Sequence, residues 1–179
     1  MPDPAAVLVR RLTPQDDRSS FNSGDIDLDR FFKRYAGQNQ FKHYIGTTYV
    51  VERQGAIIGF VTVSSGDITT EALPSTARKR LPDYPLPVLR IARLAVAKEA
   101  QGLGVGKLLL KAIFKLALTQ RDQSGCCGVL VDAKVDAIAF YERLSFIRLE
   151  SLSGELGDRP QPTPMFLSIK AIEKANNAS

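Results

Sequence analysis

The chain has 179 residues, 44% hydrophobic and 24% charged, a balance typical of a single globular domain with a sizeable core. Its net charge of +5 is a moderate basic excess, which favours polyanion partners such as nucleic acid without excluding an ordinary enzyme. The only cysteines, Cys126 and Cys127, are adjacent, and no Cys/His set has zinc spacing, so we expect neither a disulfide nor a metal site. With no signal-peptide pattern and no apolar run near the ~20 residues of a membrane span, we expect a cytoplasmic protein without membrane contact.

Hydrophobic alternation predicts several strands in the first half of the chain. Residues 7–12 alternate as a first strand, and residues 47–52 and 56–64 form two more, joined by a hairpin turn. Gly59 interrupts the third strand, where a bulge is expected. Residues 69–87 combine prolines with basic side chains and show no periodicity, so we expect a surface loop there.

A helix with two distinct faces is predicted between the first two strands. Asp25 has the place of an N-cap, and the apolar residues that follow recur at helical spacing. Arg30, Lys33 and Arg34 occupy another face. This basic face suits either a solvated helix surface or a contact with a polyanion.

The stretch that organises the chain is a strand, a glycine-rich turn and a helix. Residues 90–96 form an apolar strand, residues 101–107 carry three glycines at every second position, and residues 108–115 form an amphipathic helix. The amide groups of such a turn point outward, and the positive end of the helix dipole adds to them. The pattern therefore predicts a site for a phosphate-bearing ligand.

The rest of the chain completes a mixed sheet. Residues 128–133 form a short strand, residues 137–144 a short helix, residues 146–147 the start of a strand and residues 165–169 a closing strand, before a tail at 170–179 that we expect to fray. The order of elements predicts an α/β (α+β) fold. We expect one domain over residues 1–179, with a mixed, mostly antiparallel, twisted sheet flanked by helices on both faces.

Two familiar phosphate-binding loops do not fit the glycine turn. A P-loop needs Gly where Gln101 stands and a hydroxyl residue where Leu108 stands, and a dinucleotide fingerprint needs a different glycine spacing. Gln101, Gly104 and Gly106 instead match the pattern Gln/Arg-x-x-Gly-x-Gly/Ala. The loop resembles the acyl-CoA loop of the GNAT acetyltransferase superfamily.

A second motif strengthens this resemblance. Residues 139–146 are similar to the GNAT signature Phe-Tyr-x-x-x-Gly-Phe, and the two motifs have the expected order. Ser145 stands where the family usually has Gly. A serine at this helix end would have a small backbone cost if the position requires a positive φ.

The resemblance implies acetyl-CoA as co-substrate and a set of site residues. Tyr141 would be the general acid that protonates the leaving thiolate, although periodicity alone would make it a core tyrosine. The strand and loop would hold acetyl-CoA, and backbone amides of the strand could stabilise the oxyanion. The cofactor-binding residues implied are Leu94, Ala95, Val96, Gln101, Gly102, Gly104, Val105, Gly106 and Lys107.

A narrower likeness concerns the substrate. Residues 21–24, 28–32, 84–87 and 93–96 look like those of the GNAT toxins of bacterial toxin–antitoxin pairs. This resemblance implies acetylation of the α-amino group of aminoacyl-tRNA, which blocks translation. It also implies a small ribbon-helix-helix antitoxin as partner and a homodimer.

Several basic residues are candidates for tRNA contacts, and other functions remain open. A GNAT acting on a small amine or a protein N-terminus would use the same CoA site without the basic loop, and a non-catalytic acyl-CoA-binding module would turn nothing over. The lone His43 is interpreted as a surface or packing residue rather than a base. The tRNA-binding candidates are Arg78, Lys79, Arg80, Arg90, Arg93, Lys33 and Arg34.

Overall fold

The computed structural model describes residues 7–78, 81–149 and 162–178. Seven strands form one mixed sheet in the order β1-β2-β3-β4-β5-β7-β6, which confirms the predicted fold class. Contacts divide the chain into two compact units, residues 1–64 with 91–115 and residues 65–90 with 116–179. None of the helices in the described ranges combines the length and apolar character needed to cross a membrane.

The first unit holds the N-terminal strands and the helix expected after Asp25. β1 and β2 pair antiparallel, as do β2 and β3, and the β2–β3 register shifts opposite Gly59, which confirms the predicted bulge. Asp25 caps the helix, since its side chain accepts hydrogen bonds from the Asp27 and Leu28 amides. The elements that begin here are β1 (Val7–Arg11), α1 (Ile26–Arg30), the π-helical turn η2 (Phe31–Tyr35), α2 (Ala36–Phe41), β2 (Thr47–Arg53) and β3 (Ala56–Ile68).

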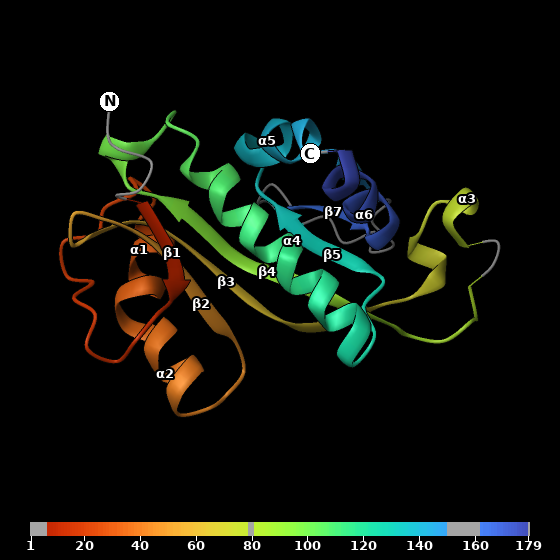
Figure 1. Ribbon diagram of the computed structural model, residues 1–179, viewed down its shortest axis with the longest axis horizontal. Coiled ribbons are helices and arrows are strands. Elements are labelled where there is room, and N and C mark those ends of the chain that lie inside the picture. Colours follow the sequence, from red (N-terminus) through yellow and green to blue (C-terminus); the bar gives the residue numbers. More distant parts are fainter. Residues whose placement is uncertain (1–6, 79–80, 150–161, 179) are drawn as a thin grey trace, which may run out of the picture. The chain divides into compact units, whose positions relative to one another are not determined.

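Helices cover both faces of β3 in this unit. Phe60 stacks on Phe32 of η2, with ring centroids 4.3 Å apart. On neighbouring Gly59, a Cβ atom would meet the side chains of Val105 and Leu109, from the start of α4 (Val105–Gln123). Since successive residues of a strand point to opposite faces, the α1–α2 segment and α4 lie on opposite sides of β3. Figure 1 shows α1 and α2 beside β1 and β2.

The core between the sheet and the α1–α2 segment is aromatic. Phe21, Phe32 and Phe60 are all buried and meet in edge-on and stacked geometry. Leu12, the residue after β1, and Val50 of β2 belong to the same cluster. This core fixes the helix that carries the basic face predicted from the sequence.

The second unit contains the C-terminal strands. β5 pairs antiparallel with β7, and β7 with β6, and Figure 1 shows β5 and β7 side by side. The predicted strand at residues 128–133 has the bounds observed. The elements not yet named are η3 (Thr70–Ala72), α3 (Ser75–Arg78), β4 (Leu86–Val96), η4 (Lys98–Ala100), β5 (Gly128–Ala133), η5 (Val135–Ala137), α5 (Ile138–Arg143), β6 (Ile147–Arg148), β7 (Thr163–Ser168) and α6 (Ile169–Ala178).

Two expectations from the sequence are wrong. The segment at 69–87, expected to be a surface loop throughout, contains among its described residues two short helices and the start of β4, where Leu86 is buried in a cluster with Leu73 and Val88. The tail expected to fray is the helix α6, which buries Ile172 and begins with a hydrogen bond from the Ala171 amide to the Ser168 hydroxyl.

Candidate active site and nucleic-acid surface

The glycine loop lies between the end of β4 and the start of α4. Gly102 and Gly104 have φ values of +80° and +85°, a conformation that side-chain-bearing residues rarely adopt. Apart from each glycine and its two chain neighbours, no atom lies within 4 Å of a Cβ built on either residue, so open space faces them. These two glycines are therefore required for backbone conformation and leave room for a ligand.

The amide groups of this loop are available for a ligand. The first hydrogen bond of α4 runs from the Leu108 amide to the Gly104 carbonyl, at 3.0 Å. Within the described part of the chain, the amides of residues 102–107 donate no hydrogen bond to another protein atom. A row of free amides at the N-terminus of a 19-residue helix forms an anion site, and exposed Lys107 adds a positive charge.

The side chain of Gln101 holds the glycine loop in place through hydrogen bonds to backbone carbonyls. Its side-chain Nε2 donates to the carbonyl oxygens of Val96, at 3.0 Å, and Ser23, at 2.9 Å. The neighbouring Lys98 amide also donates to the Asn22 carbonyl, at 2.9 Å. The segment around Asn22 and Ser23 therefore holds the glycine loop against the end of β4. The sequence placed Gln101 among ligand contacts, whereas its amide nitrogen binds the protein's own backbone.

The end of β4 is anchored to its neighbours. Ala95 is buried, and the Ala97 amide donates to the Ile58 carbonyl at 2.9 Å. Leu94 and Val96 are half-buried. The predicted cofactor residues of β4 and of the glycine loop thus come together in the first unit.

Tyr141 lies on α5 in the second unit. Only 4% of its surface is exposed, and its ring packs edge-on against those of Phe140 and Phe146. Burial raises the pKa of the Tyr141 hydroxyl above its usual range. The phenol therefore stays protonated at neutral pH, as a proton donor must.

The structure separates the predicted tRNA-binding residues into groups. Lys33, Arg34 and Arg93 belong to the first unit, where the Arg93 guanidinium lies 5.0 Å from the centroid of the Phe31 ring. In the second unit, Arg78 is exposed at the end of α3, and Arg90 forms an ion pair of 2.8 Å with Asp132. The remaining two, Lys79 and Arg80, lie outside the described residues.

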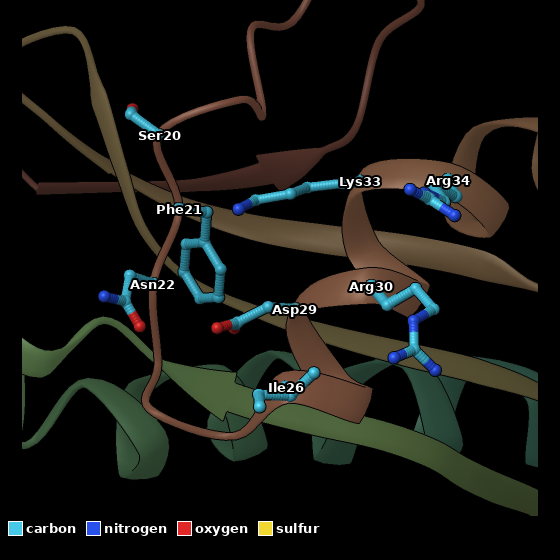
Figure 2. A pocket seen from close by; sticks show the side chains of 8 residues that line it. All are labelled: Ser20, Phe21, Asn22, Ile26, Asp29, Arg30, Lys33 and Arg34. Atoms are coloured by element: carbon cyan, nitrogen blue, oxygen red, sulfur yellow. The ribbon is translucent and has the colours of Figure 1, made fainter.

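A pocket of about 490 Å³ adjoins the basic helix face. Figure 2 shows Lys33 and Asp29 reaching from the helix toward the segment of Phe21, with Arg30 and Arg34 on the other flank of the helix. Asp29 is already satisfied, because both its oxygens accept hydrogen bonds from the Ser23 amide. The cations therefore dominate this pocket. Sequence reasoning named the basic face but missed the pocket, because residues 20–22, which form its other wall, have no periodic pattern to show that they fold back beside the helix.

Other candidate groups have ordinary surroundings. His43 is exposed after α2, in agreement with its interpretation as a surface residue. The residues that the structure describes contain no group of three or more His, Cys, Asp or Glu side chains able to hold a metal ion.

Comparisons with known proteins agree with this geometry. A model of the acetyltransferase (GNAT) domain matches residues 45–148, a range that includes the glycine loop and Tyr141. A relative from Mycobacterium tuberculosis, named tRNA-acetylating toxin, is 35% identical over 140 residues, which cover 76% of this chain and 82% of the relative.

Solved structures share the fold over nearly the whole chain. AtaT complexed with acetyl-methionyl-tRNAfMet has a TM-score of 0.81 at 25% identity and covers 95% of this chain and 99% of its own. A mutant AtaT toxin bound to the C-terminus of the antitoxin AtaR and acetyl-CoA has a TM-score of 0.74, with coverages of 96% and 98%. At 20% identity, this second likeness shows the fold alone.

Proposed function

Because this chain belongs to the GNAT acetyltransferase family, we propose that it transfers the acetyl group of acetyl-CoA to the α-amino group of an aminoacyl-tRNA. The use of acetyl-CoA is supported by the row of free amides over residues 102–107, where open space faces Gly102 and Gly104. The tRNA half is supported by the 35% identical relative named tRNA-acetylating toxin. Acetylation of the α-amino group would block translation, so the protein acts as a toxin.

The residues present fit acetyl-CoA. The loop amides and Lys107 would hold its phosphates, and the half-buried end of β4 would contact the arm that carries the thioester. When bound, acetyl-CoA supplies the activated acetyl group. The predicted contacts of Leu94, Ala95 and Val96 remain part of this proposal.

The acceptor amine needs little help from a base. An α-amino group has a pKa near 8, so a fraction of it is neutral at pH 7, whereas a lysine amine with a pKa of about 10.4 would need a base. Among the residues that the structure describes we identify no convincing base, and the lone histidine, His43, is exposed. This chemistry favours an α-amine over a lysine side chain.

Tyr141 is the proposed general acid. Its buried phenol remains protonated at the pH of the cytoplasm, and its hydroxyl would give a proton to the leaving thiolate. The rings of Phe140 and Phe146 hold its own ring in one orientation. A donor held in place in this way needs no reorganisation during the reaction.

The proposed partners follow from the same family. The phosphates of tRNA would bind the exposed cations, among them Lys33, Arg34 and Arg93, with Arg78 to Arg80 and Arg90 as further candidates. A small ribbon-helix-helix antitoxin would neutralise the toxin in the cytoplasm, and the toxin would be a homodimer.

The decisive experiment measures transfer of labelled acetyl from acetyl-CoA to a pool of charged tRNA, with free amino acids and a peptide as parallel acceptors. We expect label on aminoacyl-tRNA alone, and the labelled amino acid then identifies the tRNA used. Label only on the small amines or the peptide would keep the acetyltransferase and reject the tRNA substrate. Acetyl-CoA binding without any label would leave a non-catalytic binding module.

Replacing Tyr141 by Phe tests the general acid. The change keeps the ring between Phe140 and Phe146 and removes only the hydroxyl, so we expect turnover to fall about a hundredfold or more with thermal unfolding little changed. Steady-state kinetics with charged tRNA measure this loss. The matched control is Tyr44→Phe, since Tyr44 is 82% exposed and should keep wild-type turnover. Wild-type turnover in Tyr141→Phe would remove Tyr141 from the mechanism.

A further inference from the structure

The basic face of the first helix is built on a π-helical turn. In η2 the Ala36 amide donates to the Phe31 carbonyl, one residue further back than in an α-helix. An α-helical pattern would have paired this amide with the Phe32 carbonyl. The Phe32 oxygen is therefore open to another donor, and Lys33 and Arg34 lie inside the altered turn.

Arg18 supplies the donor from a loop before the helix. Its guanidinium NH1 donates to the Phe32 carbonyl at 2.7 Å, and the guanidinium carbon lies 6.0 Å from the centroid of the Phe32 ring. A Cβ atom on Gly37 would lie only 2.9 Å from the Arg18 NH2 atom. The glycine therefore provides the space in which the guanidinium lies against the turn.

The turn decides which way the basic side chains point. Lys33 lies inside the turn, directly after Phe32. The buried Phe32 ring fixes the helix on the core side, so the backbone conformation of the turn sets the direction of Lys33 relative to the pocket. Figure 2 shows Lys33 extending toward the segment of Phe21.

Lys33 is the cation best placed to meet a ligand in this pocket. Arg30 forms an ion pair with Asp27 at 3.5 Å, and the Asp29 carboxylate accepts a hydrogen bond from the Ser23 hydroxyl. Within the described residues, Lys33 makes no ion pair. A cation without a protein partner beside a pocket suits a phosphate group.

We propose that Arg18 is a positioning residue for tRNA binding: its hydrogen bond to the Phe32 carbonyl holds the π turn and so directs Lys33 into the pocket, where it contacts a tRNA phosphate. This inference rests on the proposed function for its substrate. Arg18 itself touches no reacting atom. Its effect belongs in the KM for charged tRNA, not in turnover or in the KM for acetyl-CoA.

Two variants remove the support by different routes. Arg18→Met deletes the donor, whereas Gly37→Ala keeps every charge and crowds the guanidinium away from the turn. We expect each to raise the KM for charged tRNA by about fivefold to tenfold, which corresponds to one weakened phosphate contact, with kcat and the KM for acetyl-CoA unchanged. Arg18→Lys, which can still donate to the Phe32 carbonyl, should recover part of the affinity.

Charge and folding need their own controls. Arg11→Met removes one exposed positive charge and should leave the KM for charged tRNA within about twofold of wild type. Alanine is a better helix former than glycine, so Gly37→Ala should not reduce helix stability by itself. If Gly37→Ala raises the KM for charged tRNA and unfolds at the wild-type temperature, the cause is therefore the displaced Arg18 guanidinium and not a loss of folding.

A double-variant cycle tests the link to Lys33. If Arg18 acts through Lys33, then Arg18→Met combined with Lys33→Met should bind charged tRNA no more weakly than Lys33→Met alone. Both single variants should reduce the slope of log affinity against log salt by about one. Additive losses, or a wild-type KM in Gly37→Ala, would overturn the inference.

A measurement without tRNA separates this inference from the proposed function. Amide hydrogen exchange at residues 31–37 should be faster in Arg18→Met than in wild type, because the turn loses its support. If the wild-type protein fails to label charged tRNA, the proposed function fails, and exchange still decides whether Arg18 holds the turn. If wild type labels charged tRNA while exchange in Arg18→Met is unchanged, the positioning role is rejected.

Discussion

At the scale of single residues, Ser145 shows how the sequence and the fold disagree locally. Its φ is +72°, in the left-handed region, and the amides of Ser145 and Phe146 donate to the Glu142 and Tyr141 carbonyls. This is a Schellman ending of α5, with Phe146 packed on Tyr141. The condition under which a serine would be costly at this position is therefore met.

Ser145→Gly should therefore stabilise the protein. Glycine adopts this φ without the clash of a Cβ atom, so we expect the free energy of unfolding to rise by about 1 kcal/mol, measured by urea denaturation. The same change at Ser124, whose φ is not positive, should lower it by a few tenths of a kcal/mol, because glycine only adds chain entropy there. Equal effects at the two sites would contradict the argument.

At the scale of elements, the glycine loop depends on a side chain that is not aimed at the ligand. Gln101 bridges two carbonyl oxygens through one amide nitrogen and so joins the end of β4 to Ser23. Gln101→Glu is nearly isosteric but replaces this donor with an acceptor facing two acceptors. We expect acetyl-CoA binding, measured by calorimetry, to weaken about tenfold or more.

A charge-matched control separates loop geometry from simple repulsion. Gln123→Glu adds the same charge at an exposed position at the end of α4 and should change the Kd for acetyl-CoA less than twofold. Gln101→Ala removes the donor without adding charge and should fall between Gln101→Glu and wild type. If Gln101→Ala binds acetyl-CoA as wild type does, the bridge has no role in shaping the loop.

Elements with a clear local pattern were predictable from the sequence. Apolar alternation and a Gly-containing turn located β2 and β3, and Asp25 located the start of α1. Residues 86–89 were missed as part of β4, because Pro85 and Pro87 obscure the strand pattern and the adjacent Val88 and Leu89 are both buried. The π turn was also missed, since it depends on Arg18, a residue from another segment.

At the scale of the whole molecule, the candidate site was only partly predictable. The glycine loop and Tyr141 stand out because each is a contiguous motif. The contact between Gln101 and Ser23 joins residues 78 positions apart in the sequence. The pocket and the contact of Arg18 with Phe32 depend on how the loop before the helix folds back on it, which no local pattern shows. The basic residues were recognisable as a class, but not the pairing of Arg90 with Asp132.

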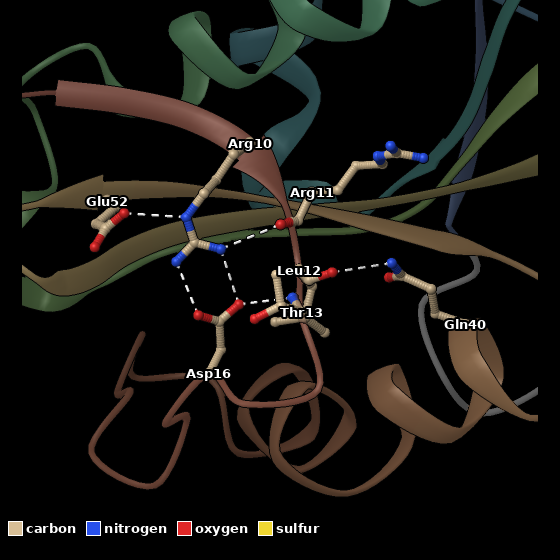
Figure 3. A network of polar contacts seen from close by, with 7 residues as sticks. All are labelled: Arg10, Arg11, Leu12, Thr13, Asp16, Gln40 and Glu52. Atoms are coloured by element: carbon tan, nitrogen blue, oxygen red, sulfur yellow. Dashed lines mark hydrogen bonds and ion pairs between the residues drawn. The ribbon is translucent and has the colours of Figure 1, made fainter.

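A network in the first unit illustrates such register-dependent contacts. Arg10 of β1 donates to Glu52 of β2 at 3.0 Å, and its guanidinium also binds both oxygens of Asp16, at 2.8 and 2.9 Å (Figure 3). Because Leu8 is paired with Glu52, Arg10 is the diagonal neighbour of that carboxylate. The network thus joins two strands to the loop that leads toward Arg18.

This network makes stability depend on pH in a defined range. The Arg10 guanidinium and the Thr13 amide lower the pKa of Asp16 from 3.8 to about 2. Since the folded state favours the ionised carboxylate, the stabilisation is complete above about pH 4 and is lost as the pH falls toward 2. Because the pair is partly exposed and screened by solvent, we expect this contribution to be about 1 kcal/mol.

Urea unfolding of wild type and Asp16→Asn at pH 5, 3.5 and 2.5, at fixed ionic strength, measures this contribution. The difference in unfolding free energy between the two proteins should be largest at pH 5 and should shrink toward pH 2.5. The substitution removes the Asp16 charge at every pH, whereas in wild type the charge is lost only as the carboxylate is protonated. Asp67→Asn, at an exposed carboxylate, should follow wild type throughout. A difference that stays constant with pH would mean that Asp16 stabilises the fold through hydrogen bonding that survives protonation and not through its charge.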